Sequence, residues 1–244
     1  METCVYVPSL NRANKIITDL PEMIFVVPKS QVRTYQKAHP QHTTIGHPER
    51  LQDIGAVRQW IIDQHEGDIL LMCDDDVRLF TRNPTTRKLT KCANAAKPIG
   101  ALYDAIDVSG YGMASIGMRL FNNTKPDIQE WYHCHTIWAI NKSLLVDHNI
   151  RIPPVCKVQE DLYLALTLGA HGYANIVFHK WAQESGAGGQ PGGCANYRTS
   201  EMQRLASEYI ASLYPRYVKV NPNPKKLQHN VRVYWKRLAN DITR

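Results

Sequence analysis

The sequence contains one stretch that decides the fold, Asp68-Ile69-Leu70-Leu71-Met72-Cys73-Asp74-Asp75-Asp76. Its apolar residues run without alternation, which is typical of a strand that is buried on both faces of a parallel sheet. Three aspartates follow the run with no intervening loop. Ligands of open α/β sheets bind beyond the carboxyl ends of the strands. The stretch therefore predicts a central strand that delivers three carboxylates to a ligand site.

The residues before this strand predict alternating strands and helices. Residues 4–8 and 23–28 are short apolar runs, rich in β-branched and aromatic residues, and a proline stops each of them. We expect a helix between these two strands, which gives a βαβ opening. Residues 31–38 are expected to form the next helix and residues 39–48 a loop. Apolar residues recur at helical spacing over residues 50–65, which predicts an amphipathic helix leading into the central strand.

The second half of the chain continues the alternation in a more mixed order. Residues 111–117 and 135–140 are expected to be strands, residues 162–168 a helix and residues 174–178 a final buried strand. Alternating strands and helices at this spacing predict an α/β domain with right-handed crossovers.

Length and composition bound the domain organisation. The chain has 244 residues, 43% of them hydrophobic, which is enough to bury one substantial core. We expect one domain over residues 1–215 and a basic tail or helix over residues 216–244. The six cysteines show no paired CxxC spacing, so neither a cysteine zinc site nor a disulfide framework is predicted. Without a long apolar run or an export signal, the protein is expected to be cytoplasmic, with no membrane partner.

A formal charge of +7 favours a polyanionic partner, such as nucleic acid, an anionic membrane or a diphosphate-bearing substrate. Basic residues crowd the tail, and aromatic residues are interleaved with them. The basic residues are Lys219, Lys225, Lys226, Arg232, Lys236, Arg237 and Arg244, and the aromatic ones are Tyr214, Tyr217, Tyr234 and Trp235. A solvated basic terminus explains the same pattern equally well.

The three aspartates at the end of the central strand predict a metal site. Their carboxylates are forced together at a strand end, where mutual repulsion is costly and a cation relieves it. Hard carboxylate oxygens suit Mg²⁺ or Mn²⁺, which keep coordination positions open for phosphate oxygens. The alternative is that the three acids serve only as turn or cap residues.

In this layout the chain resembles glycosyltransferases of the GT-A type, in which a polar loop follows the first strand and a DxD motif ends a central strand. The matching segments are Val5–Ser9 with Asn11 and Arg12, Leu70–Asp76, Val158–Leu162 as an xED element, and Phe178-His179. Together they span roughly residues 4–200, and their ordered combination is more specific than any single motif. The resemblance implies a GT-A, Rossmann-like α/β fold with a mostly parallel central sheet flanked by helices, and a nucleotide-sugar donor, expected to be a UDP-sugar.

The resemblance also implies roles for individual residues. Donor binding is expected at Pro8, Ser9, Asn11, Arg12, Arg58, Asp74, Asp75 and Arg198, and the metal ligands are expected to be Asp74, Asp76 and His179. Asp161 is the first choice for the base that takes the acceptor proton, and Glu160 is the second. Each feature also has a structural interpretation. Acids favour the first turn of any helix, a histidine is common at a strand end, and the arginines are equally explained as surface residues.

The glycine-rich stretch Gly186–Gly193 is expected to be a mobile loop. We expect it to act as a lid that orders over the donor diphosphate and excludes water, with Arg198 adding charge just beyond it. A surface linker is the alternative.

A narrower resemblance is to phage-encoded glycosyltransferases that modify hydroxymethylpyrimidines in DNA, the group associated with TET/JBP-like base hydroxylases. It rests on Val5–Ser9, on Ile54–Ile61 ahead of the DxD strand, and on the compact size. It implies 5-hydroxymethylcytosine or a related base in double-stranded DNA as the acceptor. Three alternatives stay open: a GT-A enzyme acting on polysaccharide, lipid or protein, a silent nucleotide-binding module, and a metal-dependent nuclease or phosphotransferase.

Overall fold

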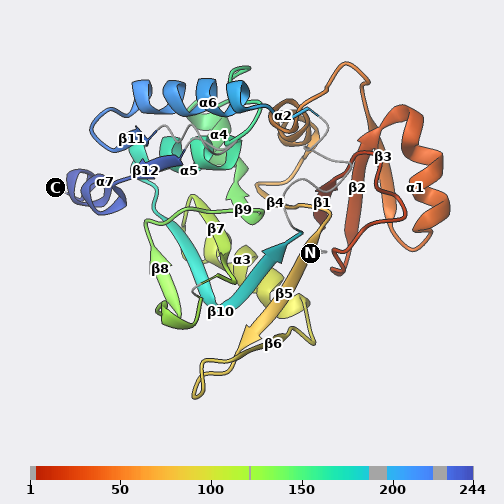
Figure 1. The fold of residues 1–244 in the computed structure, drawn as a ribbon, viewed down its shortest axis with the longest axis horizontal. Helices are drawn as coiled ribbons and strands as arrows, with labels where there is room; N and C mark the ends of the chain where they lie inside the picture. Colours follow the sequence, from red (N-terminus) through yellow and green to blue (C-terminus); the bar gives the residue numbers. More distant parts are fainter. Residues whose placement is uncertain (1–3, 121, 187–196, 222–229, 244) are drawn as a thin grey trace.

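The computed structural model describes residues 4–120, 122–186, 197–221 and 230–243. A 10-stranded sheet runs through the molecule in the order β3-β2-β1-β4-β9-β7-β10-β5-β6, with β8 paired to β10 (Figure 1). Its strands are β1 Val5–Pro8, β2 Met23–Pro28, β3 Thr43–His47, β4 Ile69–Cys73, β5 Val77–Arg82, β6 Leu89–Lys91, β7 Met113–Met118, β8 Ile128–Glu130, β9 Ile137–Asn141 and β10 Asn175–Ser185. Strands β1 to β4 pair in parallel, and the antiparallel strand β9 joins them to the second half of the sheet.

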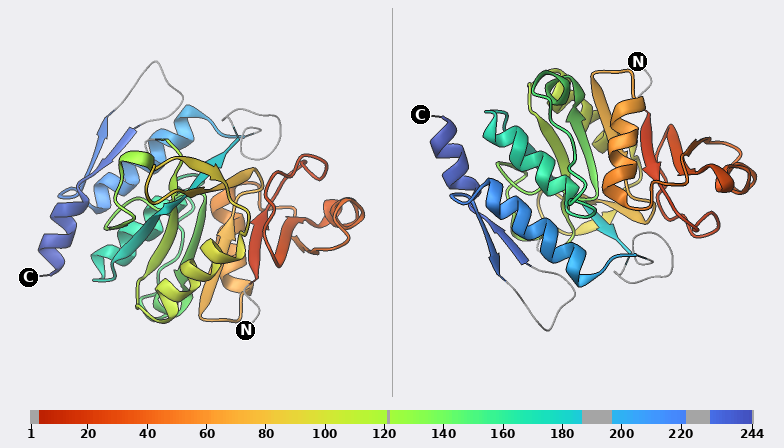
Figure 2. Two further views of the ribbon diagram at one scale, coloured as in Figure 1. Left: turned by 90° about the horizontal axis from the view of Figure 1, so that it is seen from below. Right: turned by 90° about the horizontal axis from the view of Figure 1, so that it is seen from above.

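Helices cover both faces of this sheet. They are α1 Val32–Ala38, α2 Ile54–Gln64, α3 Ala96–Asp107, α4 Lys142–Asp147, α5 Glu160–Ala170, α6 Ser200–Leu213 and α7 Trp235–Ile242, with 3-10 turns at Lys29–Gln31 and Asn122–Thr124. Helices α2, α5 and α6 lie nearest the viewer when the molecule is seen from above, and α3 does so when it is seen from below (Figure 2). Within the described residues, no helix is both long enough and apolar enough to cross a membrane.

Strand β4 is buried on both faces, as its unbroken apolar run predicts. Leu70 and Met72 belong to the hydrophobic cluster that contains the buried residues of α2 and α5. Leu71 and Cys73 belong to the opposite cluster, which contains the buried residues of α3. Because successive side chains of a strand point to opposite faces, one short strand anchors both layers of the core.

Two expectations about the N-terminal region are wrong. The segment between β1 and β2 is a loop and not a helix, because its backbone bonds to the turn after β4. The N–H groups of Ile17 and Thr18 donate to Asp75 O at 2.9 and 3.2 Å, and Thr18 Oγ1 donates to Asp74 O at 2.6 Å. The expected loop over residues 39–48 contains β3, whose β-branched residues pair in parallel with the neighbouring strand β2.

The sheet brings two polar segments to one edge. Strands β1 and β4 are parallel neighbours, with Val5 opposite Leu71 and Tyr6 opposite Met72. Ser9 and Asp74, which follow these strands, therefore lie at the same carboxyl edge. Helix α5 begins at Glu160, and this residue also reaches that edge.

The C-terminal segment packs on the main core. A hairpin of β11 Val218–Asn221 and β12 Asn230–Val233 leads into α7, beside α5 and α6 (Figures 1 and 2). Val218 is 3% exposed and Leu238 is fully buried, and both belong to the cluster that contains the buried face of α5. The end of the chain therefore supports the helix that carries the xED acids.

Candidate active site

A pocket of about 500 Å³ opens at the carboxyl edge of β1 and β4. Charged side chains of both signs line its wall. The acids are Asp53, Asp74, Asp75, Asp76, Glu160 and Asp161, and the arginines are Arg12, Arg58 and Arg198. Six carboxylates against three guanidiniums leave an excess of negative charge. This balance favours the binding of cations and, through them, of phosphate groups.

Asp75 is a buried acid with several hydrogen bonds to the protein. It is 5% exposed, and its carboxylate accepts hydrogen bonds from Ser9 Oγ and, at 2.8 Å, from Arg12 Nη1. Ser9 Oγ also lies 2.7 Å from the Tyr35 hydroxyl. Asp75 therefore fastens the loop after β1 to the loop after β4.

Asp74 and Asp76 present the carboxylates that fit a divalent cation. Arg58 Nη2 lies 2.5 Å from Asp74 Oδ1, and Arg12 Nη1 lies 3.3 Å from Asp76 Oδ2. Burial, together with the charges of Asp76 and Asp75, raises the pKa of Asp74 to about 6, although 38% of its side chain is exposed. The pKa of Asp76 is also raised, by burial and by Asp75. Such crowding of carboxylates is what a bound cation relieves.

Arg58 joins the aspartate run to the xED acids. Its side chain is 3% exposed, one η nitrogen contacts Glu160 Oε1, and the other contacts Asp74. The guanidinium also lies over the Trp138 ring, 5.4 Å from its centroid. Burial outweighs the favourable charge of Arg58 and raises the pKa of Glu160 to about 7. Glu160 is therefore held as a structural partner of Arg58.

We expect Arg58→Met to lower the free energy of unfolding by about 3–5 kcal/mol, because it leaves Glu160 buried without its partner. Urea unfolding of both proteins measures this difference. The matched control is Arg204→Met, which removes an exposed arginine paired with Glu201 and Glu208 and should change stability little. Equal effects of the two substitutions would contradict the assignment of Arg58 as a buried bridge.

Asp161 differs from its neighbour Glu160. Its Oδ1 accepts a 2.7 Å hydrogen bond from the N–H of Leu162 in the first turn of α5. Burial opposes its ionisation, but His133, His135 and Arg58 outweigh burial and hold the pKa of Asp161 below its usual range. Two adjacent carboxylates whose environments push their pKa values apart are suited to different roles. Asp161 is the one that stays ionised.

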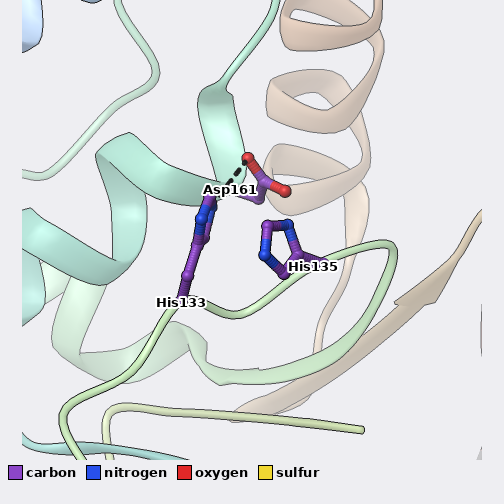
Figure 3. Close-up of side chains that lie close together, drawn as sticks. All are labelled: His133, His135 and Asp161. Atoms are coloured by element: carbon purple, nitrogen blue, oxygen red, sulfur yellow. Dashed lines mark ion pairs between the residues drawn. The ribbon is translucent and has the colours of Figure 1, made fainter. Parts of the chain in front are cut away.

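Two histidines beside Asp161 were missed by the sequence analysis. His133 Nε2 lies 4.0 Å from Asp161 Oδ1, and the rings of His133 and His135 are tilted by 40° with centroids 3.6 Å apart (Figure 3). Burial, reinforced by His133, lowers the pKa of His135 to about 3. The signal was present as an H-x-H spacing, which places two side chains on one side of an extended segment.

Other pocket residues were missed because their roles depend on tertiary contacts. Asp53 caps α2 by accepting a 2.8 Å bond from the Ala56 N–H. The Tyr197 hydroxyl accepts a 2.8 Å bond from the Ile54 N–H, so residues far apart in the sequence meet at the start of this helix. Gln159 precedes α5 in a left-handed conformation with φ of 63°, which the sequence pattern does not reveal.

Most of the expected site residues meet in the pocket. Its wall includes Pro8, Ser9, Arg12, Arg58, Asp74, Asp75, Asp76, Glu160, Asp161 and Arg198. Asn11 is not among these residues, and its role in donor binding stays a prediction. It takes a left-handed φ of 57° and exchanges hydrogen bonds of 2.9 and 2.8 Å with Gln31, outside the pocket wall.

His179 is also absent from the residues that line the pocket, so its assignment as a metal ligand stays a prediction. Strand β10 is longer than expected. It pairs with β5 up to its last residue, Ser185, which lies opposite Val77. His179 lies at an irregularity of β10, where Phe178 is opposite Ile116 of β7 and Ala182 is opposite the next residue, Gly117. Its N–H donates to Asp127 O at 2.7 Å, and its ring packs edge-on against Tyr132. Burial and nearby cations lower the pKa of His179 to about 4.

The expected lid lies largely outside the described residues, which exclude 187–196. Gly186, at its start, donates its N–H to Asp76 O at 3.2 Å. Arg198, beyond it, contributes to the pocket wall. The lid therefore stays a prediction.

Among solved structures, the chain resembles S. aureus TarS in complex with UDP, at 18% identity and a TM-score of 0.52. That match covers 86% of this chain but only 66% of the TarS chain. It also resembles glucosyl-3-phosphoglycerate synthase from Mycobacterium tuberculosis in complex with Mg²⁺ and UDP, at 13% identity and a TM-score of 0.51, covering 95% of this chain and 86% of that one. At such identities these likenesses establish the GT-A fold alone.

Two phage proteins are similar over most of the chain. The beta-glucosyl-HMC-alpha-glucosyl-transferases of Enterobacteria phages T6 and T2 are each 23% identical over 201 residues, covering 78% of this chain and 71% of each relative. Residues 3–189 match the family model of the TET-Associated Glycosyltransferases. The chain therefore belongs to the TET-associated glycosyltransferase family and is a glycosyltransferase with a GT-A fold.

Proposed function

We propose that the protein transfers a sugar from a nucleotide-sugar, a UDP-sugar, to a hydroxyl of a hydroxymethylpyrimidine in double-stranded DNA, and that it requires Mn²⁺ or Mg²⁺. The observation that carries the proposal is the single pocket in which the aspartates after β4, two partly exposed arginines and the ionised Asp161 meet. The names of the phage T6 and T2 relatives support the DNA acceptor, and the UDP complexes of the structural neighbours support the donor.

The donor diphosphate is assigned to the region between the aspartates and the arginines. Asp74 and Asp76 would hold the cation, whose chemistry is to neutralise the diphosphate as the sugar departs. Arg12 lies next to Asp76, and its guanidinium can donate two hydrogen bonds to phosphate oxygens. Arg198 is exposed at the rim of the pocket. Arg58 is too deeply buried between Asp74 and Glu160 for that task and orients the two acids instead.

Asp161 is assigned as the base. An acceptor hydroxyl is a weak nucleophile at neutral pH, so a positioned carboxylate that takes its proton speeds the attack. Asp161 stays ionised and lines the pocket, whereas Glu160 is engaged by Arg58. The charge state and the contacts of the two acids both favour Asp161.

The DNA backbone is assigned to the C-terminal hairpin and helix. Lys219, Arg232, Lys236 and Arg237 are exposed there. Lys219 and Arg232 lie over the Tyr234 ring at 6.0 and 5.3 Å from its centroid. Exposed cations beside an aromatic ring suit contact with phosphates.

The proposal is tested by incubating the protein with Mn²⁺, a panel of nucleotide sugars and three matched duplexes, followed by mass spectrometry of the nucleosides. The duplexes carry cytosine, 5-hydroxymethylcytosine or glucosylated hydroxymethylcytosine. We expect a hexose mass increase on a hydroxymethylated base, with a UDP-sugar, and none on cytosine. If the protein consumed the nucleotide sugar at the same rate with and without each duplex, the acceptor would be another molecule. Degradation of DNA without any donor would point to a nuclease.

A further inference from the structure

The side chains that surround Asp161 form a second group of potential metal ligands. His133 and His135 come from the segment between β8 and β9, and Asp161 comes from the first turn of α5 (Figure 3). One ligand atom from each of the three side chains lies within 4.8 Å of the other two, and the described residues contain no other such group of three. We propose that these side chains form a binding site for Zn²⁺, separate from the Asp74 and Asp76 site.

The donor set distinguishes the two sites. Two imidazoles and one carboxylate, with one position left open, are typical of zinc. The aspartates offer oxygen ligands only, which suit Mg²⁺ and Mn²⁺. Zinc therefore belongs at the histidines, and the harder cations belong at the aspartates.

The geometry is close to that of a tetrahedral site. Bonds of about 2.0–2.1 Å place the ligand atoms of tetrahedral zinc about 3.3 Å apart. The separation of 4.0 Å between His133 Nε2 and Asp161 Oδ1 is already near that value. Within the described part of the chain, His133 Nε2 is buried without a hydrogen-bond partner. Buried polar atoms normally have a partner, and a cation would supply one here.

Hydrogen bonds to buried residues and to the backbone fix the positions of His135 and Asp161. Ser115 is fully buried, accepts a 3.3 Å bond from the His135 N–H and donates to His135 O at 3.1 Å. Gln183, also fully buried, donates to the same carbonyl at 3.3 Å. Asp161 is fixed by the N–H of Leu162. Supporting contacts of this kind orient metal ligands before the metal binds.

Zinc at this site has a consequence for catalysis, which rests on the proposed function. Zinc bound to Asp161 would withdraw charge from the carboxylate and lower its basicity, so Asp161 would become a much weaker acceptor for the proton of the attacking hydroxyl. Zinc is therefore an inhibitor of transfer that saturating Mn²⁺ does not relieve, because the two cations occupy different ligands.

The binding test needs neither donor nor DNA. Isothermal titration with Zn²⁺, and visible absorption of bound Co²⁺ as a spectroscopic probe, are compared for the whole chain and for His133→Gln and His135→Gln. We expect each substitution to weaken binding by roughly tenfold or more and to abolish the four-coordinate Co²⁺ spectrum. The matched control is His171→Gln, which alters another pair of neighbouring histidine rings, His148 and His171. Thermal unfolding confirms that each variant is folded.

The outcomes separate this proposal from the proposed function. Equal zinc affinity in the chain and in both histidine variants would overturn the site. A second test uses Asp76→Asn, which should keep its zinc affinity, and loss of that affinity would place the zinc at the aspartates. Binding that depends on the histidines, without inhibition of transfer, would leave the site standing and remove Asp161 from the role of base.

Discussion

Asp161→Asn is expected to lower kcat by roughly a hundredfold or more, while donor binding stays nearly unchanged. A general base acts as the acceptor attacks, so its loss appears in turnover and not in the ground-state complex. The geometry supports this assignment, because Asp161 lines the pocket, whereas the neighbouring Glu160 is engaged by Arg58. Single-turnover transfer and calorimetric titration of the donor measure the two quantities separately.

Glu160→Gln is the matched comparison, because it removes the neighbouring charge and keeps an oxygen that can accept a hydrogen bond from Arg58. We expect it to reduce turnover much less than Asp161→Asn. If Asp161→Asn turned over normally and Glu160→Gln had no activity, Glu160 and not Asp161 would be the base. Unfolding curves for both variants exclude a general loss of structure.

Removal of the metal is expected to abolish transfer. EDTA should eliminate the activity and Mn²⁺ or Mg²⁺ should restore it, because Asp74 and Asp76 present crowded carboxylates where the donor diphosphate needs neutralisation. Asp76→Asn should lower kcat/KM by roughly a hundredfold or more, comparable to the loss of one electrostatic contact in a transition state.

The matched control for that substitution is Asp63→Asn, which neutralises an acid paired with Arg151 outside the pocket wall and should leave transfer unchanged. Circular dichroism checks that Asp76→Asn keeps its fold. Full activity of this variant in metal-free buffer would refute the metal assignment.

The parts of the fold that the sequence predicted are those in which local pattern and tertiary structure agree. The apolar run of β4 must be buried on both faces wherever it lies, and the spacing of α2 produces one buried stripe. The polar residues that follow β1 and β4 then meet, because the carboxyl ends of neighbouring parallel strands share an edge. These relations are readable without coordinates.

The errors arise where distant contacts decide the outcome. The loop after β1 is not helical because Ile17 and Thr18 donate their N–H groups to the turn at Asp75. His179 was assigned to a strand end, but antiparallel pairing with β5 extends β10 well beyond it. The grouping of His133 with Asp161 depends on a loop conformation that no periodicity encodes.

The packing of the chain end on α5 determines how its basic residues can be studied. Gly169 of α5 is closely covered, because a Cβ there would lie 3.0 Å from Leu238 and 3.2 Å from Trp131, and these side chains would have to shift. Elsewhere on α5, the hydroxyls of Thr167 and Tyr214 lie 2.7 Å apart. A truncation after residue 215 would uncover this apolar surface and loosen the helix that begins with Glu160 and Asp161. Charge reversal at exposed Lys219 or Lys236 is the cleaner probe, since it changes the surface potential and leaves the core intact.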